Sequence, residues 1–111
     1  MKTIVTAILS LTLFATAGVR AQTAPEAQIA AGRKLFGRHC SECHGPEGLG
    51  TERAPSITDF VRNADRSSLQ SFIKNGNLGK GMPSWSRLPD QRLDQIVSYL
   101  KSLHSQSELP R

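Results

Sequence analysis

The chain has little of what usually stabilises a small protein. Its 111 residues include two cysteines, one tryptophan and one tyrosine, and aromatic residues make up 5% of the sequence. Two cysteines cannot form the framework of several disulfides on which small secreted domains depend. So few large side chains also leave a thin core for what can be at most one small domain. The sequence therefore predicts that a metal or a bound cofactor stabilises the fold.

A hydrophobic run long enough to span a membrane is also missing. The apolar segment from Ile4 to Phe14 falls well short of the roughly 20 residues that a spanning helix needs. Lys2 precedes it, and small residues follow that allow cleavage after Ala21 or, as the alternative, after Ala17. This layout is typical of a secretory signal peptide. We expect residues 1–21 to be a cleaved signal peptide, and residues 22–111 to have no stable membrane insertion.

Positive charge is present only in moderate excess. The formal net charge is +5, and it falls to +3 when the predicted cleavage removes Lys2 and Arg20. Nucleic-acid binding calls for a dense basic patch, often with aromatic residues between the basic ones. The sequence has neither, so we expect no nucleic acid partner. It also offers no paired acid and base and no nucleophilic constellation, so we do not expect an enzyme.

Three segments place apolar residues at helical spacing, and no segment alternates as a strand would. The helices are expected over about 25–39, 67–75 and 90–103. Ser67 with Gln70 three residues later matches a capping box, and Gly76 suits the end of the second helix. The fold class predicted is all-α, with three main helices, long irregular loops and a domain core over about residues 26–104.

Both cysteines lie in one short stretch, "HCSECHG" at residues 39–45. On a helical turn Cys40, Cys43 and His44 project from one face, because they stand at i, i+3 and i+4. Two thiols can then bond along one edge of a flat ring while the imidazole reaches a metal at its centre. The C-x-x-C-H spacing is typical of covalent attachment of a c-type heme.

Three other uses of these cysteines are less consistent with the sequence. A thioredoxin-like redox pair would lie beside a βαβ pattern, which the chain lacks. A structural zinc site needs four ligands at paired spacings, and His39 and His104 do not form a second pair. A disulfide between Cys40 and Cys43 would close a very small loop and stabilise little. We therefore predict one heme c, bound covalently through Cys40 and Cys43.

The stretches "GRKLF", "CSECHG", "GMPSW" and "IVSYLKSL" together resemble the class I c-type cytochromes of the bacterial monoheme type. The resemblance runs from about residue 31 to 103. It implies a small cytochrome c fold in which the N- and C-terminal helices cross. Gly32 and Phe36 match the crossing point on the first helix, and Ile96, Tyr99 and Leu100 match it on the last.

The resemblance also implies the residues around the heme. The metal ligands would be His44 and Met82, and Met82 lies in a Gly/Pro-rich loop that frees the backbone to turn. The carbonyl of Pro55 would accept a hydrogen bond from the heme histidine. Three further side chains are expected to contact the cofactor: Phe72, Ile73 and Trp85.

The function predicted is one-electron transfer in the periplasm. An iron with both axial positions filled by protein has no open site for a substrate, and Met/His ligation is usual for a cytochrome c. The partners would be redox proteins such as a periplasmic dehydrogenase, an oxidase or a respiratory complex. Lys80 and Arg87 are expected to steer an acidic partner. Two alternatives stay open: a catalytic or gas-sensing heme protein, and a small subunit fixed in a larger oxidoreductase complex.

Overall fold

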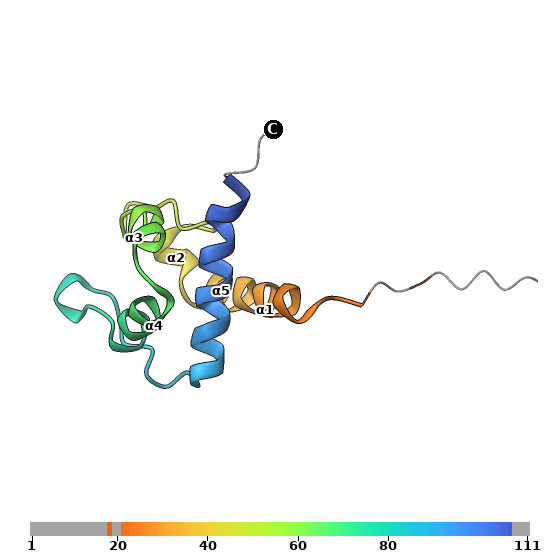
Figure 1. Ribbon diagram of the computed structural model, residues 1–111. Coiled ribbons are helices and arrows are strands. Elements are labelled where there is room, and N and C mark those ends of the chain that lie inside the picture. Colours follow the sequence, from red (N-terminus) through yellow and green to blue (C-terminus); the bar gives the residue numbers. More distant parts are fainter. Residues whose placement is uncertain (1–17, 19–20, 108–111) are drawn as a thin grey trace, which may run out of the picture.

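The computed structural model describes residue 18 and residues 21–107. Nearly all of the predicted signal peptide, residues 1–17 and 19–20, lies outside the described residues. Within the described part the protein is helical and has no strand, which confirms the all-α fold (Figure 1). The helices are α1 (Ala24–His39), α2 (Ser41–His44), α3 (Thr58–Asn63), α4 (Arg66–Asn75), the 3₁₀-helix η1 (Leu78–Lys80) and α5 (Asp90–Ser107).

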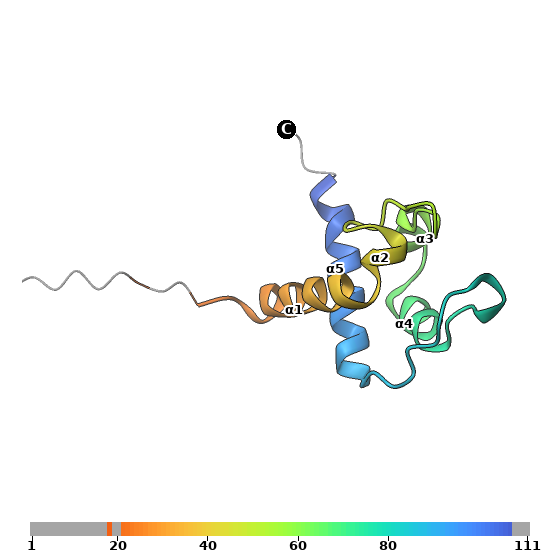
Figure 2. The same ribbon diagram turned by 180° about the vertical axis from the view of Figure 1, so that it is seen from behind.

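Helices α1 and α5 cross at a glycine. In both views α5 crosses α1, while α3 and α4 lie on the side of α5 away from the N-terminal segment (Figures 1 and 2). A Cβ placed on Gly32 would lie 1.8 Å from the backbone oxygen of Gln95, so only glycine allows this approach. Next to it the rings of Phe36 and Tyr99 pack with centroids 5.5 Å apart. The predicted crossing of the first and last helices is therefore present.

The ends of two helices differ from the sequence prediction. Helix α1 begins one residue earlier, because Thr23 and Glu26 form a reciprocal capping box at its start. For α4 the predicted cap at Ser67 is wrong. The cap is Asp65, whose Oδ1 accepts a hydrogen bond from the backbone N–H of Ser68 at 2.8 Å. This bond also lowers the pKa of the Asp65 carboxyl.

Helix α3 was not predicted, since its six residues contain only one that is buried, Val61. A side chain of α5 holds this helix in place. The Nζ of Lys101 on α5 donates hydrogen bonds to the carbonyls of Val61, at 2.8 Å, and Ala64. These are carbonyls near the C-terminal end of α3, where a positive charge also complements the helix dipole. The lysine therefore fastens α3 to α5.

The core consists of apolar side chains contributed by α1, α3, α4 and α5. Half of its largest fully buried side chains, Leu93, Ile96 and Val97, come from one stripe of α5. No polar side chain is buried among the described residues.

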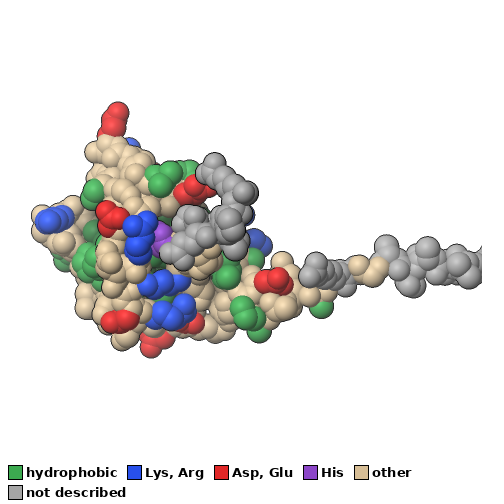
Figure 3. All heavy atoms as spheres, turned by 45° about the horizontal axis from the view of Figure 1, so that its top comes forward, with side chains coloured by type: hydrophobic (Ala, Val, Ile, Leu, Met, Phe, Trp, Pro, Cys, Tyr) green, Lys and Arg blue, Asp and Glu red, His purple; other side chains and the backbone are tan. Residues whose placement is uncertain are grey.

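The surface mixes charges of both signs. On the face shown in Figure 3, Lys and Arg side chains lie close to Asp and Glu side chains. Arg53 pairs with Glu42, and Arg66 pairs with Asp94, at 2.6 Å in both cases. In the part of the chain that the structure describes, no helix is both long and apolar enough to cross a membrane.

Candidate heme site

The motif residues lie at a single helical turn, as the spacing predicts. The backbone N–H groups of Cys43 and His44 both donate to the carbonyl of Cys40, at 3.3 and 3.0 Å. Gly45 ends the turn with a φ of 80°, a value that favours glycine. Both cysteines are free thiols, Cys40 half-buried and Cys43 exposed.

The environment of Cys40 does not favour a redox or zinc role. Burial, and to a lesser degree the neighbouring Cys43, raises the pKa of the Cys40 thiol to about 11. The thiolate is the form that attacks disulfides, and a raised pKa makes it scarce at neutral pH. Moreover, the described residues bring no three His, Cys, Asp or Glu side chains together as metal ligands. The redox-pair and zinc alternatives therefore gain no support.

The loop after the motif places a carbonyl against the motif histidine. The Nδ1 of His44 lies 3.4 Å from the carbonyl oxygen of Pro55. The loop is folded back by two backbone bonds, from Gly50 to the His44 carbonyl at 2.8 Å and from Ile57 to the Gly48 carbonyl at 2.9 Å. A proton on Nδ1 that is shared with this carbonyl leaves Nε2 free to bind a metal.

Met82 is held in a tight loop that begins where α4 ends. Asn77 and Met82 exchange two backbone hydrogen bonds, at 2.9 and 3.0 Å, and form an isolated antiparallel bridge. Gly76 ends α4 with a φ of 69°, and a Cβ there would lie 2.5 Å from the carbonyl oxygen of Pro83. The backbone around Met82 is thus closed on itself and packed against the end of the helix.

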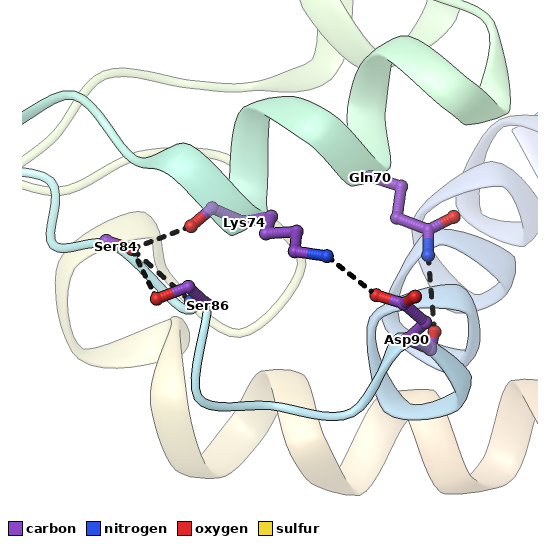
Figure 4. Close-up of polar contacts among 5 residues, drawn as sticks. All are labelled: Gln70, Lys74, Ser84, Ser86 and Asp90. Atoms are coloured by element: carbon purple, nitrogen blue, oxygen red, sulfur yellow. Dashed lines mark hydrogen bonds and ion pairs between the residues drawn. The ribbon is translucent and has the colours of Figure 1, made fainter.

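Polar contacts join the rest of this loop to α4, and join α4 to α5 (Figure 4). The Oγ of Ser84 donates to the carbonyl of Lys74 at 2.7 Å. The Nζ of Lys74 in turn lies 3.1 Å from Oδ1 of Asp90, at the start of α5. Gln70 donates from Nε2 to the Asp90 carbonyl at 3.3 Å. The loop that carries Met82 is therefore bonded to α4, and α4 is bonded to the start of α5.

His44 and Met82 line the same cavity. The cavity is partly open to solvent. Apart from His44 and Cys40, its walls carry only hydrophobic side chains: Phe36, Ile57, Phe60, Val61, Leu69, Phe72, Ile73, Met82, Ile96 and Leu100. Phe60 and Phe72 contact each other at the cavity, with centroids 5.0 Å apart, and remain partly exposed.

Three of the expected site residues, Cys43, Pro55 and Trp85, do not line this cavity. Cys43 is exposed on the motif turn. Pro55 is exposed and reaches the site only through its bond to His44. Trp85 is half-buried and packs its ring against His39, with centroids 4.9 Å apart. Contact of Trp85 with the cofactor therefore stays a prediction. Sequence analysis did not predict the contact between His39 and Trp85, because the two residues lie far apart in the chain.

Residues 27–100, more than half of the chain, match the protein family described as "Cytochrome C oxidase, cbb3-type, subunit III". The chain belongs to the class I c-type cytochromes. Cytochrome c domains of this kind bind a covalent heme c through the C-x-x-C-H motif, so the family and the motif agree.

Curated relatives show the same domain in different settings. The chain is 33% identical over 93 residues to "Quinohemoprotein alcohol dehydrogenase ADH IIB" of Pseudomonas putida, covering 80% of this chain and 13% of the dehydrogenase. It is 29% identical over 94 residues to "Cbb3-type cytochrome c oxidase subunit CcoP" of Azospirillum sp. (strain B510), covering 71% of this chain and 32% of that subunit. Thus the chain spans less than a third of the length of these two relatives.

A third relative matches along nearly its whole length. The chain is 29% identical over 104 residues to "Cytochrome c6" of Cyanidioschyzon merolae (strain NIES-3377 / 10D), covering 90% of this chain and 92% of that protein. The cytochrome domain of this family is thus similar both to a small cytochrome and to parts of larger oxidoreductases.

The residues present fit a heme. A flat, largely apolar ring suits a cavity whose walls are almost entirely hydrophobic, and the free thiols of Cys40 and Cys43 lie on the turn beside it. The cavity also has one imidazole, His44, and one thioether, Met82, among its lining residues. Imidazole and thioether are the two axial ligand types of cytochromes c.

Proposed function

We propose that the chain is a one-electron carrier with a single heme c. In this proposal Cys40 and Cys43 form the thioether bonds, and His44 and Met82 are the axial ligands. The observation that carries it is the single apolar cavity lined by both His44 and Met82, with Cys40 at its edge. The heme, when bound, supplies the change between ferrous and ferric iron.

The protein's own residues do the rest. The Pro55 carbonyl orients the His44 ring and makes it a stronger ligand. The paired backbone of Asn77 and Met82 presents the thioether with little freedom to move. The hydrophobic walls keep water out, which raises the reduction potential. Of the side chains that line the cavity, only His44 and Cys40 can exchange a proton, and both are assigned to holding the heme. This favours a carrier over a catalyst.

Covalent attachment is the first test. Each thiol would add across one vinyl group, so the mature mass should increase by one heme, and the heme should stay with the protein during acid–organic extraction. Cys40→Ala should hold its heme less firmly, through one thioether, or should contain no covalent heme. Ser102→Ala, away from the cavity, is the matched control and should keep the heme. Extraction of free heme from correctly matured wild-type protein would contradict the proposal.

We further propose that the carrier acts in the periplasm, delivered there by the predicted signal peptide. Its partners would be redox proteins of the kinds named among the relatives, a quinohemoprotein dehydrogenase or a cbb3-type oxidase. The same relatives favour a second candidate, an electron-transfer subunit fixed in a larger complex, because they contain the domain as part of a longer chain. Size-exclusion chromatography of the native protein separates the two: a free carrier elutes near its own mass, and a subunit elutes with its complex.

A further inference from the structure

Three exposed arginines have no acidic partner among the described residues. Arg38, Arg87 and Arg92 are all exposed, and within the described residues none of them takes part in an ion pair. Among the other described cations, Arg53, Arg62, Arg66 and Lys74 form ion pairs, whereas Arg33, Lys34 and Lys80 do not. Asp90, which is close to Arg92 in the chain, is already paired with Lys74 at 3.1 Å. Within the described part of the chain, the three positive charges are therefore left without a negatively charged partner.

These arginines gather around the His39–Trp85 pair. The guanidinium carbon of Arg87 lies 5.0 Å from the centroid of the Trp85 ring, and the His39 ring lies against the same tryptophan at 4.9 Å. Arg38 is the chain neighbour of His39. Partial burial and then the charges of the three arginines lower the pKa of His39 below its ordinary value of 6.5. The permanent positive charge of this surface belongs to the arginines.

The cluster lies next to the heme cavity. His39 directly precedes Cys40, and Trp85 follows Met82 by three residues, and both Cys40 and Met82 line the cavity. The cluster thus joins the motif turn, which carries Cys40, to the loop that carries Met82. We name it the Arg/Trp patch: Arg38, His39, Trp85, Arg87 and Arg92.

We propose that the Arg/Trp patch is the docking surface for a redox protein with an acidic surface; this inference rests on the proposed function. Tryptophan and arginine are the residues most enriched at the energetic centres of protein interfaces. A half-buried aromatic centre with charged residues around it has the anatomy of such an interface. Uncompensated positive charge steers acidic partners and speeds their association. Of the two cations expected from the sequence to steer a partner, Arg87 belongs to the patch and Lys80, in η1, does not.

An acidic protein fits this patch better than a membrane. Binding in a membrane interface needs apolar side chains that enter the acyl region next to the basic ones. The large hydrophobic side chains that the described residues expose are Leu49, Phe60, Phe72 and Leu78, and none belongs to the patch. Trp85 is half-buried and already covered by His39 and Arg87, so it cannot insert without losing both contacts.

The test uses the heme-loaded protein and two small oxidants of opposite charge. Stopped-flow oxidation of the ferrous protein is measured with hexacyanoferrate(III), an anion, and with tris(phenanthroline)cobalt(III), a cation. The variant Arg38→Gln/Arg87→Gln/Arg92→Gln should lower the ratio of the anion rate to the cation rate by about tenfold at low ionic strength. The difference should disappear at high salt, where the charges are screened. Poly-L-glutamate should slow the wild type and not the variant.

A control triple removes the same amount of charge elsewhere: Arg33→Gln/Arg53→Gln/Arg62→Gln. If it lowers the ratio as much as the patch triple does, only net charge matters and the proposal is overturned. An unchanged ratio in a patch triple with an intact heme spectrum and potential also overturns it. Failure of the proposed function would show differently, as wild-type protein without covalent heme or without reversible reduction.

Two additions keep the test decisive. If the patch triple does not fold, the single variant Arg38→Gln replaces it, because Arg38 is exposed on α1. The ratio of the anion rate to the cation rate should then fall by a smaller factor. An unchanged ratio in Arg38→Gln would overturn the proposal. Sedimentation with anionic phosphatidylglycerol vesicles tests the other occupant. If the protein binds these vesicles and the binding requires the three arginines, the patch binds membranes, and the proposal that it docks an acidic protein is overturned.

Discussion

At the scale of single residues, Met82 decides between a carrier and a catalyst. A methionine in a loop is more often packing than ligand, but this one lines the apolar cavity together with His44. We predict that the ferric protein shows the weak red absorption band of sulfur–iron bonding. Met82→Ala should abolish the band, lower the potential and let carbon monoxide bind the ferrous iron rapidly, since the sixth position is then open.

Cleavage of the signal peptide would remove Met1, so Met1 could not replace Met82 as a ligand. The control for Met82→Ala is a conservative change elsewhere on the cavity wall. Ile73→Val keeps an apolar side chain at the wall and should keep both the band and the exclusion of carbon monoxide. An unchanged spectrum and potential in Met82→Ala would mean that another group binds the iron. A catalytic or gas-binding heme protein would then become the better reading.

At the scale of helices, the crossing of α1 and α5 rests on a missing side chain. In Gly32→Ala the new Cβ would meet the Gln95 backbone and the Cβ of Tyr99, and the helices must move apart. We predict that this change lowers the free energy of unfolding by about 1–3 kcal/mol or more. Gly37→Ala is the control: it lies in the same helix, nothing stands within 4 Å of its added Cβ, and alanine favours a helix by about 0.5–1 kcal/mol. Chemical denaturation of both variants measures the contrast; equal effects would contradict the account.

The cap of α4 gives a pH-dependent prediction. The hydrogen bond from the Ser68 N–H lowers the pKa of Asp65 below its ordinary value of 3.8. A lowered pKa means that the stabilisation is fully present above that ordinary value and is lost as pH falls through the lower, folded value. Asp65→Ala should therefore lower the midpoint temperature of thermal unfolding at pH 6. The difference in midpoint between variant and wild type should become smaller as the pH approaches 3. Ser67→Ala should change the unfolding free energy by no more than about 0.5 kcal/mol at either pH. A larger loss for Ser67→Ala would restore the cap predicted from the sequence.

At the scale of the whole molecule, the core and the heme cavity are continuous. Six side chains belong to both: Phe36, Val61, Leu69, Ile73, Ile96 and Leu100. Without a heme these side chains face an open cavity, and the short helices are marginal alone in water. We predict that a Cys40→Ser/Cys43→Ser variant without bound heme shows no sharp thermal transition by circular dichroism. A cooperative transition with native helix content would contradict this, and heme-loaded wild type is the reference.

Local signals in the sequence predicted the three long helices to within a few residues. The apolar stripe of α5 is periodic over many turns, so its period alone identifies it. Helix α3 and the cap at Asp65 escaped because they depend on distant or alternative partners. Lys101 fastens α3 from far along the chain, and Asp65 and Ser67 are both good capping residues that only the folded turn can tell apart.

The sequence by itself determined the family and predicted the chemistry of the site. A C-x-x-C-H motif places its three side chains on one face of any helical turn, and one methionine in a Gly/Pro-rich loop was the evident partner, so neither needed a tertiary structure. The tertiary structure alone decided which surfaces meet. It brought Pro55 to His44, closed the Met82 loop on Asn77, and packed His39 against Trp85 between unpaired arginines. Such contacts join residues far apart in the chain or depend on how a loop folds. Local sequence periodicity does not predict them, because they form only when the helices and loops pack around one cavity.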